Sequence, residues 1–269
     1  MTRGVATGTP AAGPLAGRRI LVTRAADQAG EMVAALQALG AEPCLCPTIA
    51  ILDPPDFTEF DAALDALDRF EFLILTSSNA VDACMRRLTA RRVEPAALAA
   101  LCVVAVGPKT AEALQAYGRQ ADLVPDDYRA EGVVALLAGR VAGKRILYPH
   151  AELARDLIIS ELGRHGALLT APVAYRSGPP PEAADQLRQA LADGLDLLTF
   201  TASSTARNLV DLLDEPWRSQ AQQIPVAAIG PLTSRTCREL GLRVVIEPPA
   251  ATVDALLAAI VDYYATTSP

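Results

Sequence analysis

Hydroxyl side chains occur at two corresponding places in the chain, each directly after a mostly apolar run of strand length. The first run is Phe72-Leu73-Ile74-Leu75 and the second is Leu195 to Phe200. The hydroxyl residues that follow are Thr76, Ser77 and Ser78 in the first copy, and Thr201, Ser203 and Ser204 in the second. A helical pattern comes next in both copies, so the hydroxyls are predicted to lie where a strand ends and a helix begins.

Two glycine-containing turns follow two further apolar runs. They read Gly107-Pro108-Lys109-Thr110 and Gly230-Pro231-Leu232-Thr233. Glycine frees the backbone at the start of each turn, and a threonine follows three residues later in both. Only the first turn adds a cation, Lys109. The residues of interest here are Gly107, Lys109, Thr110, Gly230 and Thr233.

The start of a helix carries unpaired N–H groups and the positive end of the helix dipole, which bind carboxylates and phosphates. Four such ends facing one cleft would suit a ligand with several acidic groups, because local dipoles would substitute for net positive charge. Serine, threonine and asparagine are also the favoured N-caps of helices. Each hydroxyl taken alone therefore has a purely structural explanation, and both interpretations stay open.

The chain contains an internal repeat in the order A, B, A′, B′. Block A opens with Gly17-Arg18-Arg19-Ile20-Leu21 and A′ with Gly143-Lys144-Arg145-Ile146-Leu147, and the hydroxyl clusters belong to B and B′. A period of about half the chain is too long for a solenoid and indicates two similar domains with a cleft between them. Proline-rich stretches after A and A′ predict crossings near Leu52 and near Tyr175 to Gly178, although a tandem arrangement stays open.

Strand, turn and helix follow one another through both halves, as in the βαβ units of a parallel α/β sheet. Continuous apolar runs are typical of strands that are buried on both faces. Ligands in such sheets bind beyond the carboxyl ends of the strands, where the hydroxyls are predicted to lie. Among local features, we expect a short strand at Ala121 to Val124, a loop at Pro216-Trp217 and a disordered leader over residues 1–16.

Composition limits the class of function. The 269 residues, 51% of them hydrophobic, suffice for two cores. The net charge is −7, and the sequence contains no basic block of the kind that binds nucleic acid. No apolar stretch reaches the ~20 residues of a membrane span, and the first residues lack the apolar core of a signal peptide. We therefore expect a cytoplasmic protein that binds neither nucleic acid nor a membrane.

Familiar cofactor and metal motifs are absent from the sequence. It contains no CxxC pair, no GxGxxG, no GxxxxGK[ST] and no Gly-x-Ser-x-Gly. The odd number of cysteines indicates reduced, mostly buried thiols. No metal site and no cofactor are predicted.

In six segments the chain resembles the uroporphyrinogen-III synthase family. Together the segments run from Gly17 to about Ile260. They are Ile20 to Arg24, Leu75 to Val81, Ala105 to Gly107 with Thr110, Pro172 to Arg176, Phe200 to Ser204, and Ala228 to Pro231 with Thr233. Each motif is short, but six in the same order with similar spacing are specific.

The resemblance implies two flavodoxin-like parallel-sheet domains joined by a two-stranded linker, with a cleft between them. The family's domains are discontinuous, which implies 17–51 with 178–269 as one domain and 52–177 as the other. It also implies a cofactor-free hydro-lyase of haem biosynthesis, which we expect to be a monomer. Its small-molecule substrate, hydroxymethylbilane, is a linear tetrapyrrole with eight carboxylates that loses water and closes with ring D inverted.

The resemblance also assigns residues. Tyr175 falls on the family's inter-domain tyrosine, and we expect its phenol to donate a hydrogen bond to the departing hydroxyl; simple packing of a linker aromatic is the alternative. Arg24 and Arg155 match arginines that the family places at the substrate. His150 stands near a position where many relatives carry arginine. Because of this departure, the alternative that the protein is a non-catalytic relative stays open.

Two other classes of function compete with the synthase. One is a sensor of the same architecture that binds a tetrapyrrole or another polyanion without turning it over. The other is a periplasmic-type two-lobed binding protein, which the missing signal peptide disfavours. Turnover of hydroxymethylbilane separates these classes.

Overall fold

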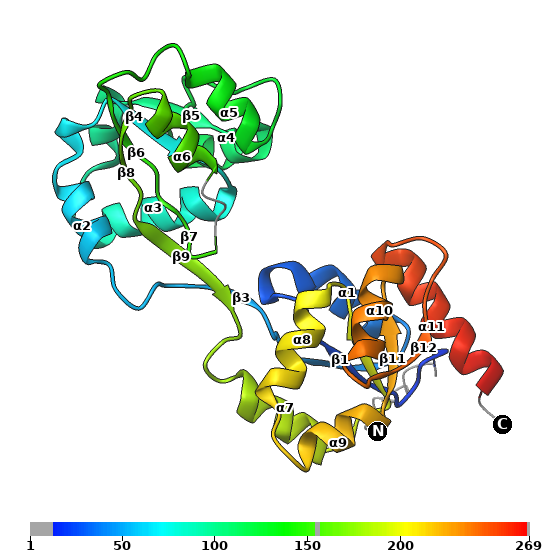
Figure 1. The fold of residues 1–269 in the computed structure, drawn as a ribbon. Coiled ribbons are helices and arrows are strands. Elements are labelled where there is room, and N and C mark those ends of the chain that lie inside the picture. The colour runs from blue at the N-terminus through cyan, green and yellow to red at the C-terminus, as the bar shows by residue number, and fades with distance from the viewer. Residues whose placement is uncertain (1–12, 154–156, 268–269) are drawn as a thin grey trace, which may run out of the picture. The chain divides into compact units, whose positions relative to one another are not determined.

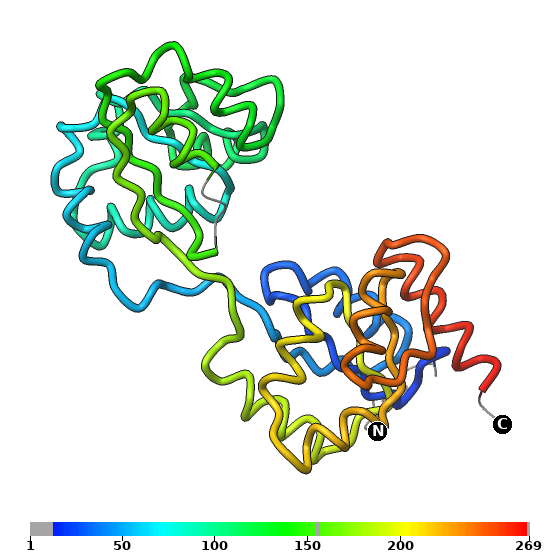
Figure 2. The backbone as a smooth tube through the Cα atoms, in the orientation of Figure 1, coloured from blue at the N-terminus to red at the C-terminus, as the bar shows by residue number. Residues whose placement is uncertain are grey.

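The computed structural model describes residues 13–153 and 157–267. The chain divides into two compact units, one formed by Met1–Ala50 with Gly178–Pro269 and the other by Ile51–Ser177. Figure 2 shows both ends of the described chain, in blue and in orange to red, within the first unit, while the cyan and green segments form the second. The first unit is therefore discontinuous in sequence.

The first unit is a parallel sheet with helices on both faces (Figure 1). Its elements are β1 (Arg19–Val22), α1 (Ala26–Ala38), β2 (Glu42–Leu45), α7 (Ala183–Ala192), β10 (Leu197–Phe200), α8 (Ser203–Leu212), α9 (Trp217–Gln223), β11 (Pro225–Ala228), α10 (Pro231–Glu239), β12 (Arg243–Ile246) and α11 (Val253–Thr267). The strand order is β12-β11-β10-β1-β2, and all neighbouring pairs are parallel. Counted along the chain, this is the 2-1-3-4-5 order of flavodoxin-like folds.

The second unit has the same plan, but its repeat blocks follow one another in the opposite order along the chain: B comes before A′, whereas in the first unit A comes before B′. Its elements are α2 (Thr58–Asp65), β4 (Phe72–Leu75), α3 (Ser78–Ala90), β5 (Cys102–Ala105), α4 (Pro108–Ala116), α5 (Ala130–Leu137), β6 (Arg145–Leu147), β7 (His150–Ala151), α6 (Leu157–Arg164) and β8 (Leu168–Thr170), with 3₁₀ turns at Leu67–Arg69 and Pro95–Ala100. Its parallel sheet has the order β5-β4-β6-β8. Counted from β6, this is again 2-1-3-4.

A small third sheet lies where the chain passes between the units. It has the order β3-β9-β7, with β3 at Ala50–Leu52 and β9 at Val173–Gly178. The limits of the units, Ala50/Ile51 and Ser177/Gly178, fall within these two strands. The chain thus leaves and re-enters the first unit through one ribbon.

Alternation of side chains explains why the central strands are apolar throughout. In β1, Ile20 and Val22 pack on one face of the sheet, whereas Leu21 belongs to the cluster on the other face. In β4, Leu73 and Leu75 likewise face one cluster and Ile74 the other. Successive strand residues point to opposite faces, so both faces of each sheet are covered. The predicted doubly covered parallel α/β fold is confirmed.

Three local predictions are wrong. The leader ends too late, because Leu15 is fully buried and its N–H donates to the Leu39 carbonyl at 3.0 Å; residues 1–12 lie outside the described residues. Trp217 begins helix α9 rather than lying in a loop, with Pro216 at the N-cap. The expected strand at 121–124 is only a bridge between Leu123 and Val104, because the Asp122 carboxylate accepts the N–H of Val103.

Candidate active site

The carboxyl ends of β4 and β6 mark the place in the second unit where the strand order reverses. These strands are neighbours in the sheet, but the connections that follow them lead to opposite edges. Parallel α/β sheets bind their ligands at such a switch point. Thr76 is the first residue after β4 and Tyr148 the first after β6. The ends of these two strands therefore lie side by side at the switch point.

Ser77 connects helix α3 to the tyrosine that the family resemblance singles out. It is the N-cap of α3, and its Oγ accepts the N–H of Ala80 at 3.0 Å. The same oxygen lies 3.0 Å from the phenolic oxygen of Tyr175, which projects from β9 and is only 7% exposed. Two of the predicted site residues, Ser77 and Tyr175, are therefore in direct contact. Ser78, the next residue, is exposed.

Tyr148 is a second phenol in this place that our sequence reasoning missed as a site residue. Its side chain is 3% exposed. Burial raises the pKa of Tyr148, the nearby Thr76 side chain opposes that rise, and the nearby Tyr175 adds to it. The signal was available, because Tyr148 directly follows an apolar run in the repeat, as Thr76 does. Unlike Thr76, it is followed by a short strand, β7, and not by a helix.

The start of helix α4 lies beside that of α3, because β5 pairs with β4. Gly107 is the N-cap of α4, and a Cβ there would lie 3.2 Å from the ring of Tyr128. Thr110 in the first turn is buried, whereas Lys109 and Tyr128 are exposed. A Cβ at this position would therefore require the Tyr128 side chain to shift by a few tenths of an ångström. Lys109 is the exposed cation at this helix start.

In the first unit one of the three hydroxyls at the corresponding strand end, that of Ser203, ties two helices together. Ala202, not a hydroxyl residue, is the N-cap of α8 and has no capping side chain. Ser203 accepts a hydrogen bond from Thr236 of α10 at 3.0 Å and donates to the Leu232 carbonyl at 3.4 Å. Ser204 is exposed and Thr201 half-buried. The structural interpretation therefore holds for Ser203, and Ser204 remains accessible.

Gly230 and Thr233 occupy the start of α10 as their counterparts do in α4. Gly230 is the N-cap, and a Cβ there would lie 3.2 Å from Ala251, which takes the place that Tyr128 has in the second unit. Thr233 is buried. Arg24, which follows β1, is half-buried, and its Nε donates to Gln28 at 3.4 Å. These residues line the carboxyl edge of the first unit's sheet.

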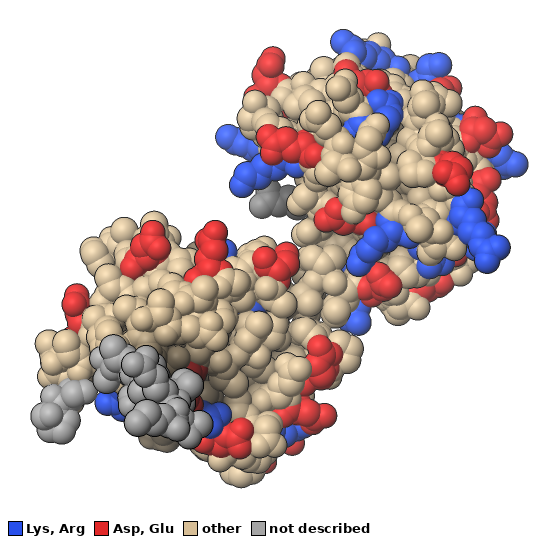
Figure 3. All heavy atoms as spheres, turned by 180° about the vertical axis from the view of Figure 1, so that it is seen from behind, with Lys and Arg blue, Asp and Glu red and all other residues tan. Residues whose placement is uncertain are grey.

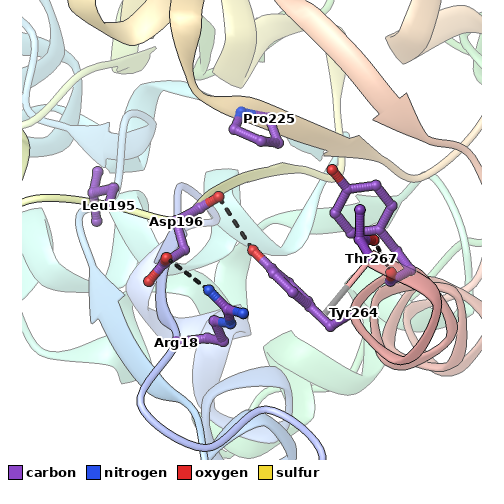
Figure 4. Close-up of a pocket in the computed structure, with 7 residues that line it drawn as sticks. Arg18, Leu195, Asp196, Pro225, Tyr264 and Thr267 are labelled. Carbon is purple, nitrogen blue, oxygen red and sulfur yellow. Dashed lines mark hydrogen bonds and ion pairs between the residues drawn. The ribbon is translucent and has the colours of Figure 1, made fainter. Parts of the chain in front are cut away.

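The opposite edge of that sheet carries a pocket of about 350 Å³ (Figure 4). Arg18 and Asp196, which precede β1 and β10, form an ion pair at 3.3 Å. The Arg18 guanidinium lies over the Tyr264 ring, 4.6 Å from the centre of that ring. The Tyr264 hydroxyl donates to the Asp196 carbonyl at 3.2 Å. The arginine's charge is therefore compensated within the pocket. The carboxyl edges of the two sheets, where helices begin, are therefore better candidates for binding a polyanion.

Comparison with known proteins identifies the family. The family model for uroporphyrinogen-III synthase HemD matches residues 30–258. A uroporphyrinogen-III synthase from Synechococcus elongatus is 39% identical over 254 residues, which cover 92% of this chain and 96% of that relative. The chain belongs to the uroporphyrinogen-III synthase family. Members of this family are cyclising hydro-lyases of the haem pathway.

Solved structures of this family share the fold. A mutant uroporphyrinogen III synthase from the extremely thermophilic bacterium Thermus thermophilus has a TM-score of 0.53 at 21% identity and covers 94% of this chain and 100% of its own. The uroporphyrinogen-III synthetase of Helicobacter pylori has a TM-score of 0.53 at 16% identity, with 92% and 99% covered. At these identities the likeness shows a shared two-domain α/β architecture.

Two positions that the family resemblance singled out, His150 and Arg155, follow β6. His150 lies in β7 with its ring nitrogens near two backbone carbonyls, Nδ1 at 2.7 Å from Ala151 O and Nε2 at 2.9 Å from Ala171 O. Both ring nitrogens thus face backbone carbonyl groups. Arg155 lies outside the described residues.

Figure 3 shows the charged side chains on one face of each unit. Basic and acidic side chains lie interspersed there on both units. Among residues 13–153 and 157–267, no cluster of three or more His, Cys, Asp or Glu side chains could hold a metal ion. No helix within the same ranges is long and apolar enough to cross a bilayer.

Proposed function

We propose that this member of the family acts as the synthase itself, converting hydroxymethylbilane into uroporphyrinogen III. The substrate loses its terminal hydroxyl as water, ring D is inverted, and the macrocycle closes without a cofactor. The observation that carries the proposal is the 39% identity to the Synechococcus elongatus enzyme over nearly the full length of both chains. The contact between Ser77 and Tyr175 at a strand end supports it from the structure.

Tyr175 is proposed to protonate the departing hydroxyl. Ser77 Oγ already accepts the Ala80 N–H, so its own O–H can donate to the phenolic oxygen of Tyr175, 3.0 Å away. The phenolic O–H of Tyr175 then points away from Ser77 and donates to the substrate. The C–O bond breaks, the hydroxyl takes that proton and leaves as water, and the proton later lost from ring D restores the phenol. A positioned acid of this kind contributes about 10²–10⁴-fold.

The carboxylates of the substrate are proposed to bind at the starts of four helices, two in each unit. In the second unit these are α3 and α4, with Thr76, Ser77, Ser78, Gly107, Lys109 and Thr110; in the first they are α8 and α10, with Thr201, Ser203, Ser204, Gly230 and Thr233, and the end of β1 with Arg24. Backbone N–H groups and helix dipoles supply most of the attraction. Arg155 is proposed as a further cation for the substrate.

Several further properties of the protein belong to this proposal. We propose that the domains are 17–51 with 178–269 and 52–177, that the protein is a monomer in the cytoplasm, and that it binds no nucleic acid. The net charge of −7 supports the last point, since binding to nucleic acid rests on clustered positive charge. The cysteines, all free among the described residues, agree with a reducing compartment.

Multiple turnover distinguishes the enzyme from a non-catalytic binder of the same fold. Purified protein is mixed with a hundredfold excess of hydroxymethylbilane, and the loss of the open chain is followed against its spontaneous cyclisation. The synthase consumes many equivalents of the bilane per chain and yields the type III product. Protection of one equivalent, with the remainder cyclising at the spontaneous rate, would identify a binder instead.

A further inference from the structure

Four buried threonines lie at the switch point of the first unit. Strands β1 and β10 are neighbours there, but the connections that follow them lead to opposite edges of the sheet. The four side chains, each at most 2% exposed, are those of Thr23, Thr48, Thr199 and Thr205. Valine has nearly the same shape and would fill such positions without the cost of burying a hydroxyl, so packing alone does not account for the threonines.

Thr48 connects the end of strand β1 to helix α8. Its N–H donates to the Thr23 carbonyl, directly after β1, at 3.1 Å. Its Oγ1 lies between two carbonyls, 3.0 Å from that of Thr205 and 3.5 Å from that of Thr23. Its own carbonyl accepts the Asn208 side-chain amide at 2.7 Å, and Thr205 and Asn208 both belong to α8. Every polar group of this fully buried residue is therefore in use.

The other three hydroxyls extend these contacts to β10 and to the start of α8. Thr23 Oγ1 donates to the Thr199 carbonyl at 2.8 Å, and Thr199 Oγ1 donates back to the Leu21 carbonyl of β1 at 2.7 Å. Thr205 Oγ1 donates to the carbonyl of Ala202, the N-cap of α8, at 2.8 Å. Each of the four hydroxyls thus has a partner, and a buried polar network that is fully satisfied makes its surroundings rigid.

We propose that Thr48 is a positioning residue for substrate binding: it holds the end of β1 to α8 and so fixes Arg24, which follows Thr23, relative to the start of α8. The proposal rests on the proposed function, which assigns substrate carboxylates to both places. Thr48 is fully buried and acts through its neighbours. A ligand that engages both places at once loses affinity when their spacing is no longer fixed. Proton transfer from Tyr175, in the other unit, should be unaffected.

The test compares Thr48→Val, which keeps the shape and removes the hydroxyl, with Thr48→Ser, which keeps the hydroxyl and removes a methyl group. In Thr48→Val we expect KM for hydroxymethylbilane to rise about two- to tenfold, the effect of one lost hydrogen bond, while kcat changes by less than about twofold. Thr48→Ser should lower the midpoint of urea unfolding, because it leaves a small cavity, but keep the wild-type KM. Tyr264→Phe is the control: it also removes a buried, hydrogen-bonded hydroxyl from the first unit, but at the amino edge of the sheet, and KM should not change.

An unchanged KM in Thr48→Val would overturn the proposal, and so would a loss confined to kcat or an equal rise of KM in Thr48→Ser. If Thr48→Val does not fold, Asn208→Ala takes its place, because it removes the bond to the Thr48 carbonyl from a half-buried position. It should raise KM by a similar factor, and an unchanged KM would then overturn the proposal.

A second readout does not depend on turnover. Uroporphyrin, a tetrapyrrole with eight carboxylates, is titrated into each variant in a calorimeter. Thr48→Val should bind it about two- to tenfold more weakly than the wild type, whereas Thr48→Ser and Tyr264→Phe should bind it equally well. If the wild-type protein fails to convert the bilane, the proposed function fails, and this titration alone decides the role of Thr48: equal affinity in Thr48→Val, or no binding to the wild type, refutes it.

Discussion

Removing the Ser77 hydroxyl tests whether this residue does more than cap a helix. Its oxygen accepts the Ala80 N–H and contacts the Tyr175 hydroxyl, whereas the neighbouring Ser78 is exposed. Ser77→Ala loses the cap, which costs about 1 kcal/mol, and the partner of Tyr175, which costs about another 1 kcal/mol. The expected loss in free energy of unfolding is about 2 kcal/mol.

Ser77→Gly separates the two contributions. Glycine at an N-cap costs only about a few tenths of a kcal/mol relative to serine, so most of its expected loss of about 1 kcal/mol reports on the Tyr175 contact. Both variants lose the same hydroxyl and should therefore lose the same factor in turnover, about fivefold for 1 kcal/mol. Ser78→Ala is the control and should change stability by less than about 0.5 kcal/mol.

The assay combines urea unfolding, which is monitored by circular dichroism, with amide hydrogen exchange across α3. The single tryptophan, Trp217, lies in the other unit, so its fluorescence monitors the part of the chain that the substitution does not touch. Exchange at the start of α3 should accelerate in Ser77→Ala and less so in Ser77→Gly. Wild-type stability and turnover in Ser77→Gly would refute the reasoning, because the Tyr175 contact would then contribute nothing.

Further predictions concern the acid, the ion pairs and the thiols. Tyr175→Phe should lower turnover about 100-fold or more and leave bilane affinity nearly unchanged; near-wild-type turnover would show that the residue only packs. The Arg87 side chain lowers the pKa of Asp61, so the stability this pair contributes is present above the ordinary pKa of about 3.8 and is lost as the pH falls through the lowered value. Asp61→Asn should therefore destabilise the protein in urea at pH 7 and do so progressively less as the pH falls below about 3.8, and an effect that does not change with pH would contradict the pairing. Burial raises the pKa of three thiols, those of Cys46, Cys84 and Cys237, to about 12. In native protein at pH 8 a disulfide reagent should therefore leave these cysteines unmodified until denaturant is added. Rapid labelling of the native protein would contradict their burial.

The repeat and the continuous apolar runs predicted the fold because each determines local structure directly. A strand such as Phe72–Leu75 reads as buried on both faces, and it is flanked by two separate hydrophobic clusters. The equivalence of the blocks also carries over, since β6 and β8 from the second half of the repeat take the places that β1 and β2 have in the first unit. Which blocks share a sheet did not follow from the residues, because a tandem arrangement satisfies the same local pattern.

The site was harder to predict because a hydroxyl before a helix has the same sequence signature whether it caps, ties helices together or meets another side chain. Ser77 both caps α3 and contacts the Tyr175 side chain, while Ser203 joins α8 to α10. Tyr148 lies outside that signature, and its place beside the end of β4 depends on the pairing of β6 with a strand about seventy residues earlier in the chain. Contacts of that kind are set by the sheet order, which no local pattern contains.

The isomer ratio of the product tests the central claim most directly. Hydroxymethylbilane that cyclises by itself gives the type I isomer, whereas ring inversion gives type III, so the ratio reports the enzyme and not merely the loss of substrate. The protein is titrated from zero against a fixed amount of bilane, and the uroporphyrin isomers are separated after oxidation. We predict a type III fraction that rises with protein toward completion and that falls back toward type I in Tyr175→Phe. A product that stays type I at every concentration of the wild-type protein would contradict the account.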